Sequence, residues 1–367
     1  MTRTTDDSTT TGTAAADGVR GDLLSCYSAA FAACLAAYGV DQNLAVGGQL
    51  FLGLRRDGEL LEFLHHHTPL SGDADFYRLD MRRRGAADPE SAAESIRAEA
   101  ERRGIALVTG STGTLPWIDR GSALPAPHWF VVRPSAGSTG QVAVDDRFTW
   151  LDEHGDHPGF QGTVAAAEVG RLAWSPLPVG AEALSRERWA LGDPRVRPAW
   201  SAARPWQWWE CASATVRDAS GVGFGRAVLE RSSAGAITDP SVASRGWTVG
   251  RAAFDELADA MSAGLGEPDT YRCGTDLWVA YRNRQAFAAA LHHAQRLGVA
   301  GGLDGVGAWV SGELVPSWAG VTRAMRYNAL RVQQGVRPHT GLLPELRRLG
   351  ELEDEARRRL ATALAGG

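Results

Sequence analysis

The sequence predicts an α+β fold, in which a central helix packs on an antiparallel sheet and a mainly helical part follows. Three observations support this fold class. The apolar run from Ser25 to Tyr38 stops at Gly39, as a buried helix does. Two strand-like runs, 128–133 and 141–146, flank a loop of turn-forming residues and predict a β-hairpin. After residue 210, apolar residues recur mainly at helical spacing.

The composition bounds the class of protein. With 367 residues and 44% hydrophobic content, the chain can bury the cores of two modest domains. A net charge of -5 lacks the basic footprint of nucleic-acid-binding proteins, and the absence of lysine excludes a lysine nucleophile. Residues 1–18 contain no apolar core, so we expect a disordered tail rather than a signal peptide or membrane anchor. These features predict a cytoplasmic protein whose partners are neither nucleic acid nor membrane.

Cys26 opens the first predicted helix. A thiol in the first helical turn faces the positive end of the helix dipole and backbone N–H groups that can bind an oxyanion, which favours a nucleophilic thiolate. Cys34 lies about 12 Å further along the same helix, too far for a disulfide, and the cysteines show no metal-ligand spacing. We therefore expect free thiols, with Cys26 as the nucleophile and Cys34, Cys211 and Cys273 as structural residues.

The predicted hairpin supplies a base for this thiol. If Arg133 pairs with Gln141 beside the loop, His128 faces Asp146 across the two strands. Side chains alternate along a strand, so Asp146 shares a face with His128 and Asp145 points to the other face. A histidine held by a carboxylate and presented to a cysteine is the arrangement that activates a thiol nucleophile.

Other signals divide the chain into units. Asp88, followed by Pro89, predicts the start of a helix that ends at Gly104 and leads into a strand over 105–109. We expect one domain over 19–175, a Pro- and Trp-rich connector over 176–209, and a mainly helical domain over 210–367. Within the last, apolar periodicity predicts four helices, which cover 248–261, 276–297, 315–332 and 345–364.

The order of these motifs resembles that of papain-like folds, and most closely the family of the N-terminal domain of the butirosin biosynthesis H protein, which is similar to bacteriocin-processing cysteine peptidases. The resemblance covers roughly residues 20–175. It rests on Cys26 to Gly39, Gly47 to Gly53, Ala92 to Val108, Leu115-Pro116-Trp117, His128 to Val132 and Val142 to Asp146. In this family the acid is usually followed by proline, whereas Asp146 precedes Arg147. This departure leaves the choice between Asp145 and Asp146 open as far as the resemblance goes.

The resemblance implies a papain-like domain with Cys26, His128 and Asp146 as the catalytic residues. It implies an acyltransferase of antibiotic biosynthesis, which forms an amide from a carrier-protein thioester and an amine such as an amino sugar. Enzymes of lincosamide assembly are similar in size. The partners would be an acyl or peptidyl carrier protein and a small-molecule amine. No cofactor is implied beyond the phosphopantetheine arm of the carrier protein, which is part of the substrate.

Alternative interpretations remain for several residues. The same triad would serve a cysteine peptidase or amidase, and a satisfied core histidine would fit an inactive scaffold domain. His65, His66 and His67 are more typical of a polar turn than of a metal site, because consecutive residues do not face one centre. Three arginine runs, 55–56, 82–84 and 102–103, are either solvated faces or a docking rim for an acidic carrier protein.

Overall fold

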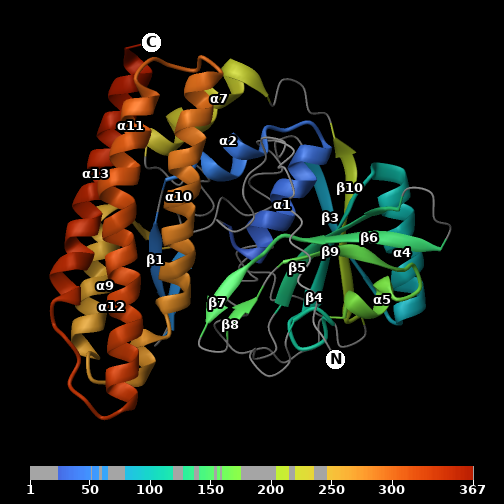
Figure 1. Ribbon diagram of the computed structural model, residues 1–367, viewed down its shortest axis with the longest axis horizontal. Coiled ribbons are helices and arrows are strands. Elements are labelled where there is room, and N and C mark those ends of the chain that lie inside the picture. Colours follow the sequence, from blue (N-terminus) through green and yellow to red (C-terminus); the bar gives the residue numbers. More distant parts are fainter. Residues whose placement is uncertain are drawn as a thin grey trace, which may run out of the picture.

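The computed structural model describes residues 24–50, 52–57, 60–64, 79–118, 127–135, 140–152, 155–157, 159–174, 204–214, 220–234 and 246–366. Over these residues the chain combines helices with antiparallel sheets, as the sequence predicted (Figure 1). The predicted tail over 1–18, residues 176–203 of the predicted connector and the three consecutive histidines lie outside the described residues.

A six-stranded antiparallel sheet organises the first part of the chain. Its strands lie in the order β3, β10, β4, β5, β6, β9. Their bounds are β3 Leu79–Ala86, β4 Ala106–Ser111, β5 Pro127–Pro134, β6 Gln141–Asp146, β9 Phe160–Ala165 and β10 Trp206–Ala214. A separate two-stranded ribbon, β7 (Trp150–Asp152) and β8 (Gly155–His157), follows β6.

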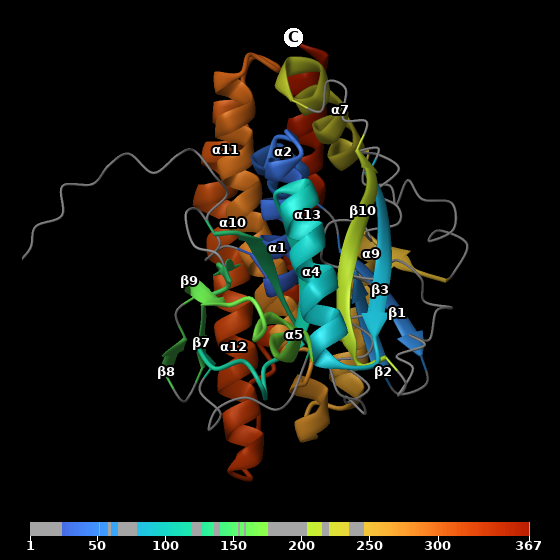
Figure 2. The same cartoon turned by 90° about the vertical axis from the view of Figure 1, so that its right-hand side faces the viewer.

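Helices cover both faces of this sheet, so the strands are apolar on both sides. On one face, α1 (Cys26–Ala37) packs on β5, where Trp129 and Val131 are buried. On the other face, α4 (Pro89–Arg103) and α5 (Val169–Leu172) lie together, above Phe130 and Val132 (Figure 2). Alternate residues of one strand therefore belong to two different cores.

The ends of α4 follow the local signals in the sequence. The Asp88 carboxylate accepts a hydrogen bond from the backbone N–H of Ser91 at 2.7 Å, and Pro89 opens the helix. Gly104 closes it with a φ of 77°, a left-handed conformation that costs glycine little. Both predicted ends of this helix are confirmed.

A bundle of helices forms the second part of the chain, on the α1 side of the sheet (Figure 1). The four predicted helices are confirmed as α9, α10, α12 and α13, with ends shifted by a few residues. Among the described helices, none is long and apolar enough to cross a membrane. One helix of the first part, α2 (Gln42–Gly47), packs on the bundle at α10. The elements of the second part are α7 Gly221–Ser233, α9 Arg251–Ala263, η2 Pro268–Tyr271, α10 Gly274–Arg296, α11 Leu303–Trp309, η3 Val310–Leu314, α12 Val315–Gln333 and α13 Leu342–Ala365.

The two parts exchange segments along the chain. Strand β10 spans 206–214 and lies inside the large sheet, so it crosses the predicted boundary between connector and helical domain. A three-stranded sheet joins β1 (Gly53–Asp57) and β2 (Leu60–Leu64) to β11 (Thr248–Val249), which comes from the second part. One continuous core of buried residues runs from α1 into the bundle. The helices of the second part therefore share one core with the helix that carries Cys26, and α2 packs on both α1 and α10.

Candidate active site

The start of α1 presents Cys26 at a capped helix terminus. Cys26 is the first helical residue, and the Ser25 hydroxyl oxygen accepts a hydrogen bond from the Ser28 backbone N–H at 3.1 Å. The backbone N–H of Cys26 has no acceptor within the helix, since that residue stands at the first position. Cys26 is partly exposed, whereas Cys34, Cys211 and Cys273 are buried. Cys26 is therefore the most accessible of the four thiols, as a nucleophile would have to be.

His128 and Asp146 meet as predicted, although the register of the hairpin differs. The His128 Nε2 atom lies 2.7 Å from Asp146 Oδ2, and both side chains are buried. Arg133 pairs with Ala143 rather than with Gln141, because β5 continues through Pro134. The predicted register was therefore wrong by two residues. A shift of two keeps every side chain on its face, so Asp146 reaches His128 diagonally instead of from directly opposite.

Asp145 has a different environment. It pairs with Val131 in the ladder, on the opposite face from His128. Its carboxylate accepts hydrogen bonds from Arg147 Nε and from Gln161 Nε2, both at 2.9 Å. Asp146, and not Asp145, is the carboxylate that contacts His128.

The surroundings of His128 favour its charged form. Burial lowers the pKa of His128, but the negative charges of Asp146 and Cys26, together with hydrogen bonds to both, raise that pKa from 6.5 to about 10. Because Nε2 is occupied by Asp146, Nδ1 is the ring nitrogen left to face the thiol. An imidazolium between a carboxylate and a thiol stabilises the thiolate, which is the reactive form of cysteine.

Two further donors fix the Asp146 carboxylate. The indole Nε1–H of Trp117 donates to Oδ2 at 2.8 Å, and the backbone N–H of Phe148 donates to Oδ1 at 3.2 Å. Trp117 itself stacks on Phe160, with ring centres 4.5 Å apart, and meets Phe130 edge to face. The sequence suggested Trp117 only as part of a turn. Its polar N–H in an apolar setting is the signal that points to a buried acceptor.

The bundle reaches the same site through α10. Arg282 is buried and donates from Nη1 to the backbone carbonyl of Thr149 at 2.6 Å. Its guanidinium lies over the rings of Phe148 and Trp278, at 5.4 and 4.4 Å from their centres. The Phe148 ring in turn lies 5.8 Å from the His128 ring, centre to centre. Arg282 thus braces the segment that follows Asp146. This role was not predicted from the sequence, because Phe148 and Thr149 lie more than a hundred residues from Arg282 in the chain.

The arginine runs and the tryptophans of the predicted connector have partners within the fold. Of the three arginine runs, most members pair with a nearby acid or amide, and those pairs are Arg55 with Glu62, Arg56 with Glu256, Arg82 with Asp80, Arg83 with Gln207, Arg84 with Glu210 and Arg102 with Glu99. Trp208 and Trp209 are buried in strand β10. Within the part of the chain that the structure describes, no group of three His, Cys, Asp or Glu side chains could hold a metal ion.

Comparison of the chain with protein-family models and with curated proteins gives no match. The resemblance drawn from the sequence therefore stays a hypothesis, and the geometry around Cys26 is its main physical support.

Proposed function

We propose that the protein is a cysteine acyltransferase that takes an acyl group from a carrier-protein thioester and passes it to an amine. The observation that carries this proposal is the combination of a partly exposed thiol at a helix start with a buried, carboxylate-held histidine. Nucleophile, base and orienting acid occur together, which is the usual composition of a covalent acyl-transfer site. The resemblance to antibiotic-assembly acyltransferases supports the choice of donor and acceptor.

The first half-reaction acylates the enzyme. The Cys26 thiolate attacks the thioester carbonyl carbon, and the oxyanion that forms is held by backbone N–H groups at the start of α1. The carbon–sulfur bond to the carrier then breaks, and His128 gives its proton to the departing thiolate. A thioester replaces a thioester, so this step is nearly balanced in free energy.

The second half-reaction forms the amide. The acceptor amine attacks acyl-Cys26, His128 takes the proton from the amine nitrogen, and the Cys26 thiolate leaves. Conversion of a thioester to an amide runs downhill and drives the cycle. Asp146 keeps His128 in place through both transfers, because it holds Nε2 and leaves Nδ1 to exchange protons at the thiol.

Burial of the base favours aminolysis over hydrolysis. The side chain of His128 is only 2% exposed, and the Phe148 ring lies beside it. The Trp278 and Arg282 side chains of α10 cover Phe148 in turn. A site that admits little water protects an acyl-enzyme until the acceptor binds.

Intact-mass spectrometry tests the proposal directly. The full chain is incubated with a panel of acyl carrier proteins, and we expect one acyl group to remain on Cys26, as located by peptide mapping. Addition of the right amine or amino sugar should discharge the adduct to an amide. A Cys34→Ala variant should behave like the unmodified chain. Absence of an adduct, or its loss at the same rate with and without amines, would contradict the proposal and favour a hydrolase.

A further inference from the structure

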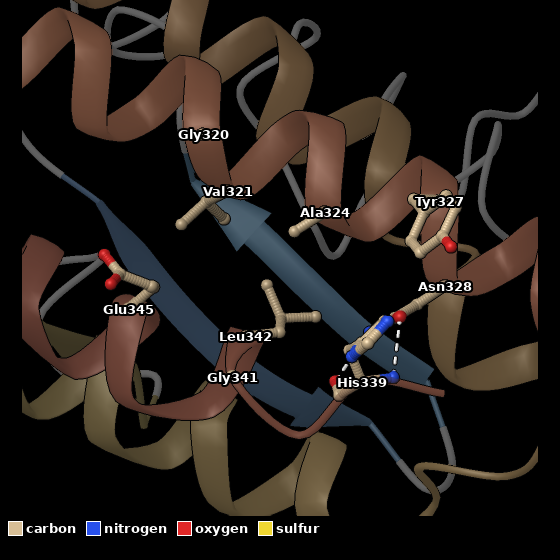
Figure 3. A pocket seen from close by; sticks show the side chains of 9 residues that line it. All are labelled: Gly320, Val321, Ala324, Tyr327, Asn328, His339, Gly341, Leu342 and Glu345. Atoms are coloured by element: carbon tan, nitrogen blue, oxygen red, sulfur yellow. Dashed lines mark hydrogen bonds between the residues drawn. The ribbon is translucent and has the colours of Figure 1, made fainter. Parts of the chain in front are cut away.

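The end of α12 and the turn after it expose apolar side chains to solvent. Tyr327, Leu330 and Val336 are 50%, 49% and 41% exposed, and they rank among the most exposed large hydrophobic residues that the structure describes. Tyr327 also lines an apolar groove of about 310 Å³ between α12 and the start of α13 (Figure 3). Val321, Ala324 and Leu342 contribute to its lining. Exposed apolar surface beside a groove is typical of a binding surface.

The same segment is strongly basic. Residues 315–344 contain Arg323, Arg326, Arg331 and Arg337 and no acid, in a chain whose net charge is -5. None of these four arginines forms an ion pair with a described carboxylate, unlike the arginine runs near the sheet. Arg331 donates instead to the Arg337 carbonyl and the Tyr327 hydroxyl. Guanidinium groups without a carboxylate partner among the described residues, set around apolar side chains, suit a partner that carries both carboxylates and apolar side chains.

The groove is held in shape before any partner arrives. The Asn328 side chain donates to the backbone carbonyl of His339 and accepts from its backbone N–H, both at 2.9 Å. The His339 ring stacks on Tyr327 with 5.7 Å between centres. Glu345, the one acid in the lining, lies at the other end of the groove from His339 (Figure 3). A partner that binds there therefore causes little loss of conformational entropy in the protein.

We propose that this surface docks an acidic protein that delivers the acyl thioester. The docking surface is defined by Arg323, Arg326, Tyr327, Leu330, Val336 and Arg337. The proposal rests on the proposed function, which requires a protein-bound donor. The fold supports the location, because α12 packs on α10 and on η2, the turn that precedes α10. A donor bound here sits on the helix pair whose α10 member braces the catalytic segment through Arg282.

A comparison of two donors with the same acyl group tests the docking surface. The full chain is assayed with an acyl carrier protein and with the matching thioester of N-acetylcysteamine, which needs no docking. In an Arg323→Glu/Arg326→Glu variant we expect the KM for the carrier protein to rise about tenfold, with unchanged kcat and unchanged kinetics for the small donor. Raising the salt concentration should produce the same rise in KM in the unmodified chain.

A matched control reverses charge on the far side of the sheet. Arg97→Glu/Arg171→Glu on α4 and α5 makes the same change in net charge and should leave the KM for the carrier protein unchanged. A Leu330→Asp variant should raise the KM for the carrier protein and leave the kinetics with the small thioester unchanged. Its melting temperature is measured to confirm that the fold is intact.

The outcomes separate the two proposals. If both donors work and the Arg323→Glu/Arg326→Glu variant uses the carrier protein normally, the docking surface is wrong and the acyl-transfer proposal stands. If neither donor is used by the unmodified chain, the proposed function fails and the docking surface falls with it. The unmodified chain is also tested for binding to anionic lipid vesicles. If it binds them through this surface, and the Arg323→Glu/Arg326→Glu variant keeps its KM for the carrier protein, the surface binds a membrane and the docking proposal is wrong.

Discussion

Two buried carboxylates, one beside the sheet and one in the bundle, are built from the same parts. Asp146 accepts a hydrogen bond from the indole of Trp117, and Glu353 accepts one from the indole of Trp318, both at 2.8 Å. Each carboxylate also pairs with a buried basic side chain. Asp146 holds His128 at 2.7 Å, and Glu353 holds Arg284 at 2.6 and 3.1 Å.

The difference between them lies in the basic partner and in what stands next to it. Arg284 is enclosed by α10, α12 and α13, and a guanidinium does not serve as a proton donor in proteins. His128 titrates, and its ring lies against a partly exposed thiol. The Arg284–Glu353 pair therefore stabilises the bundle, whereas the His128–Asp146 pair can transfer protons. Chemistry depends on the titratable partner and the accessible nucleophile, not on the buried carboxylate.

Loss of the thiol should give the largest effect. Cys26→Ala removes the nucleophile, and we expect acyl transfer to fall by more than about 10⁴-fold while the melting temperature stays within a degree or two. Steady-state rates and a thermal melt measure both. Cys34→Ala is the control, since that buried side chain should affect stability rather than activity. Retention of several per cent of the activity by Cys26→Ala would remove Cys26 from the mechanism.

Neutralising each carboxylate should separate the two regions. Asp146→Asn should lower acyl transfer by about 10²- to 10⁴-fold, because His128 loses its restraint and its charge partner. Glu353→Gln should destabilise the fold by about 3–5 kcal/mol, because it leaves the Arg284 charge buried without a counterion. Denaturant unfolding gives the free energy of unfolding of each variant, and steady-state kinetics gives its rate of acyl transfer. If Glu353→Gln is as stable as the unmodified chain but inactive, Glu353 takes part in catalysis and its assignment as a purely structural residue is wrong.

Removing each indole donor should have the smallest effect. Trp117→Phe keeps a ring against Phe160 but removes one hydrogen bond to Asp146, worth roughly 1–1.5 kcal/mol, so we expect about a tenfold loss of kcat. Trp318→Phe should cost a similar free energy of unfolding and leave kcat unchanged. Equal losses of kcat in the two variants would show that Trp117 acts only through packing.

Much of the site could be predicted because its parts follow local rules. The helix start places Cys26, and strand alternation assigns Asp146 rather than Asp145 to the face of His128. The register itself was missed, since nothing in the loop sequence indicates that pairing continues through Pro134. The assignment of side chains to the two faces of the sheet stayed correct, because the register was shifted by an even number of residues.

Other features depend on distant packing and leave no local trace. Strand β10 enters the sheet from beyond residue 200, where the Trp-rich sequence suggested a connector. Arg282 lies in a helix whose periodicity is visible, but its partners at 148–149 are far away in the chain. Long-range pairings of this kind are set by the shape of the whole core, not by the residues on either side.

The most direct test of the central claim is the pH dependence of Cys26 alkylation by iodoacetamide, in the unmodified chain and in Asp146→Asn. His128 has a pKa raised to about 10, so its charged form stabilises the folded protein fully below pH 6.5, and this stabilisation is lost as the pH rises through about 10. We therefore predict that Cys26 is alkylated much faster in the unmodified chain than in Asp146→Asn wherever His128 is charged, and that the difference shrinks as the pH rises through about 10. Equal alkylation rates in the two proteins across that range would contradict the account.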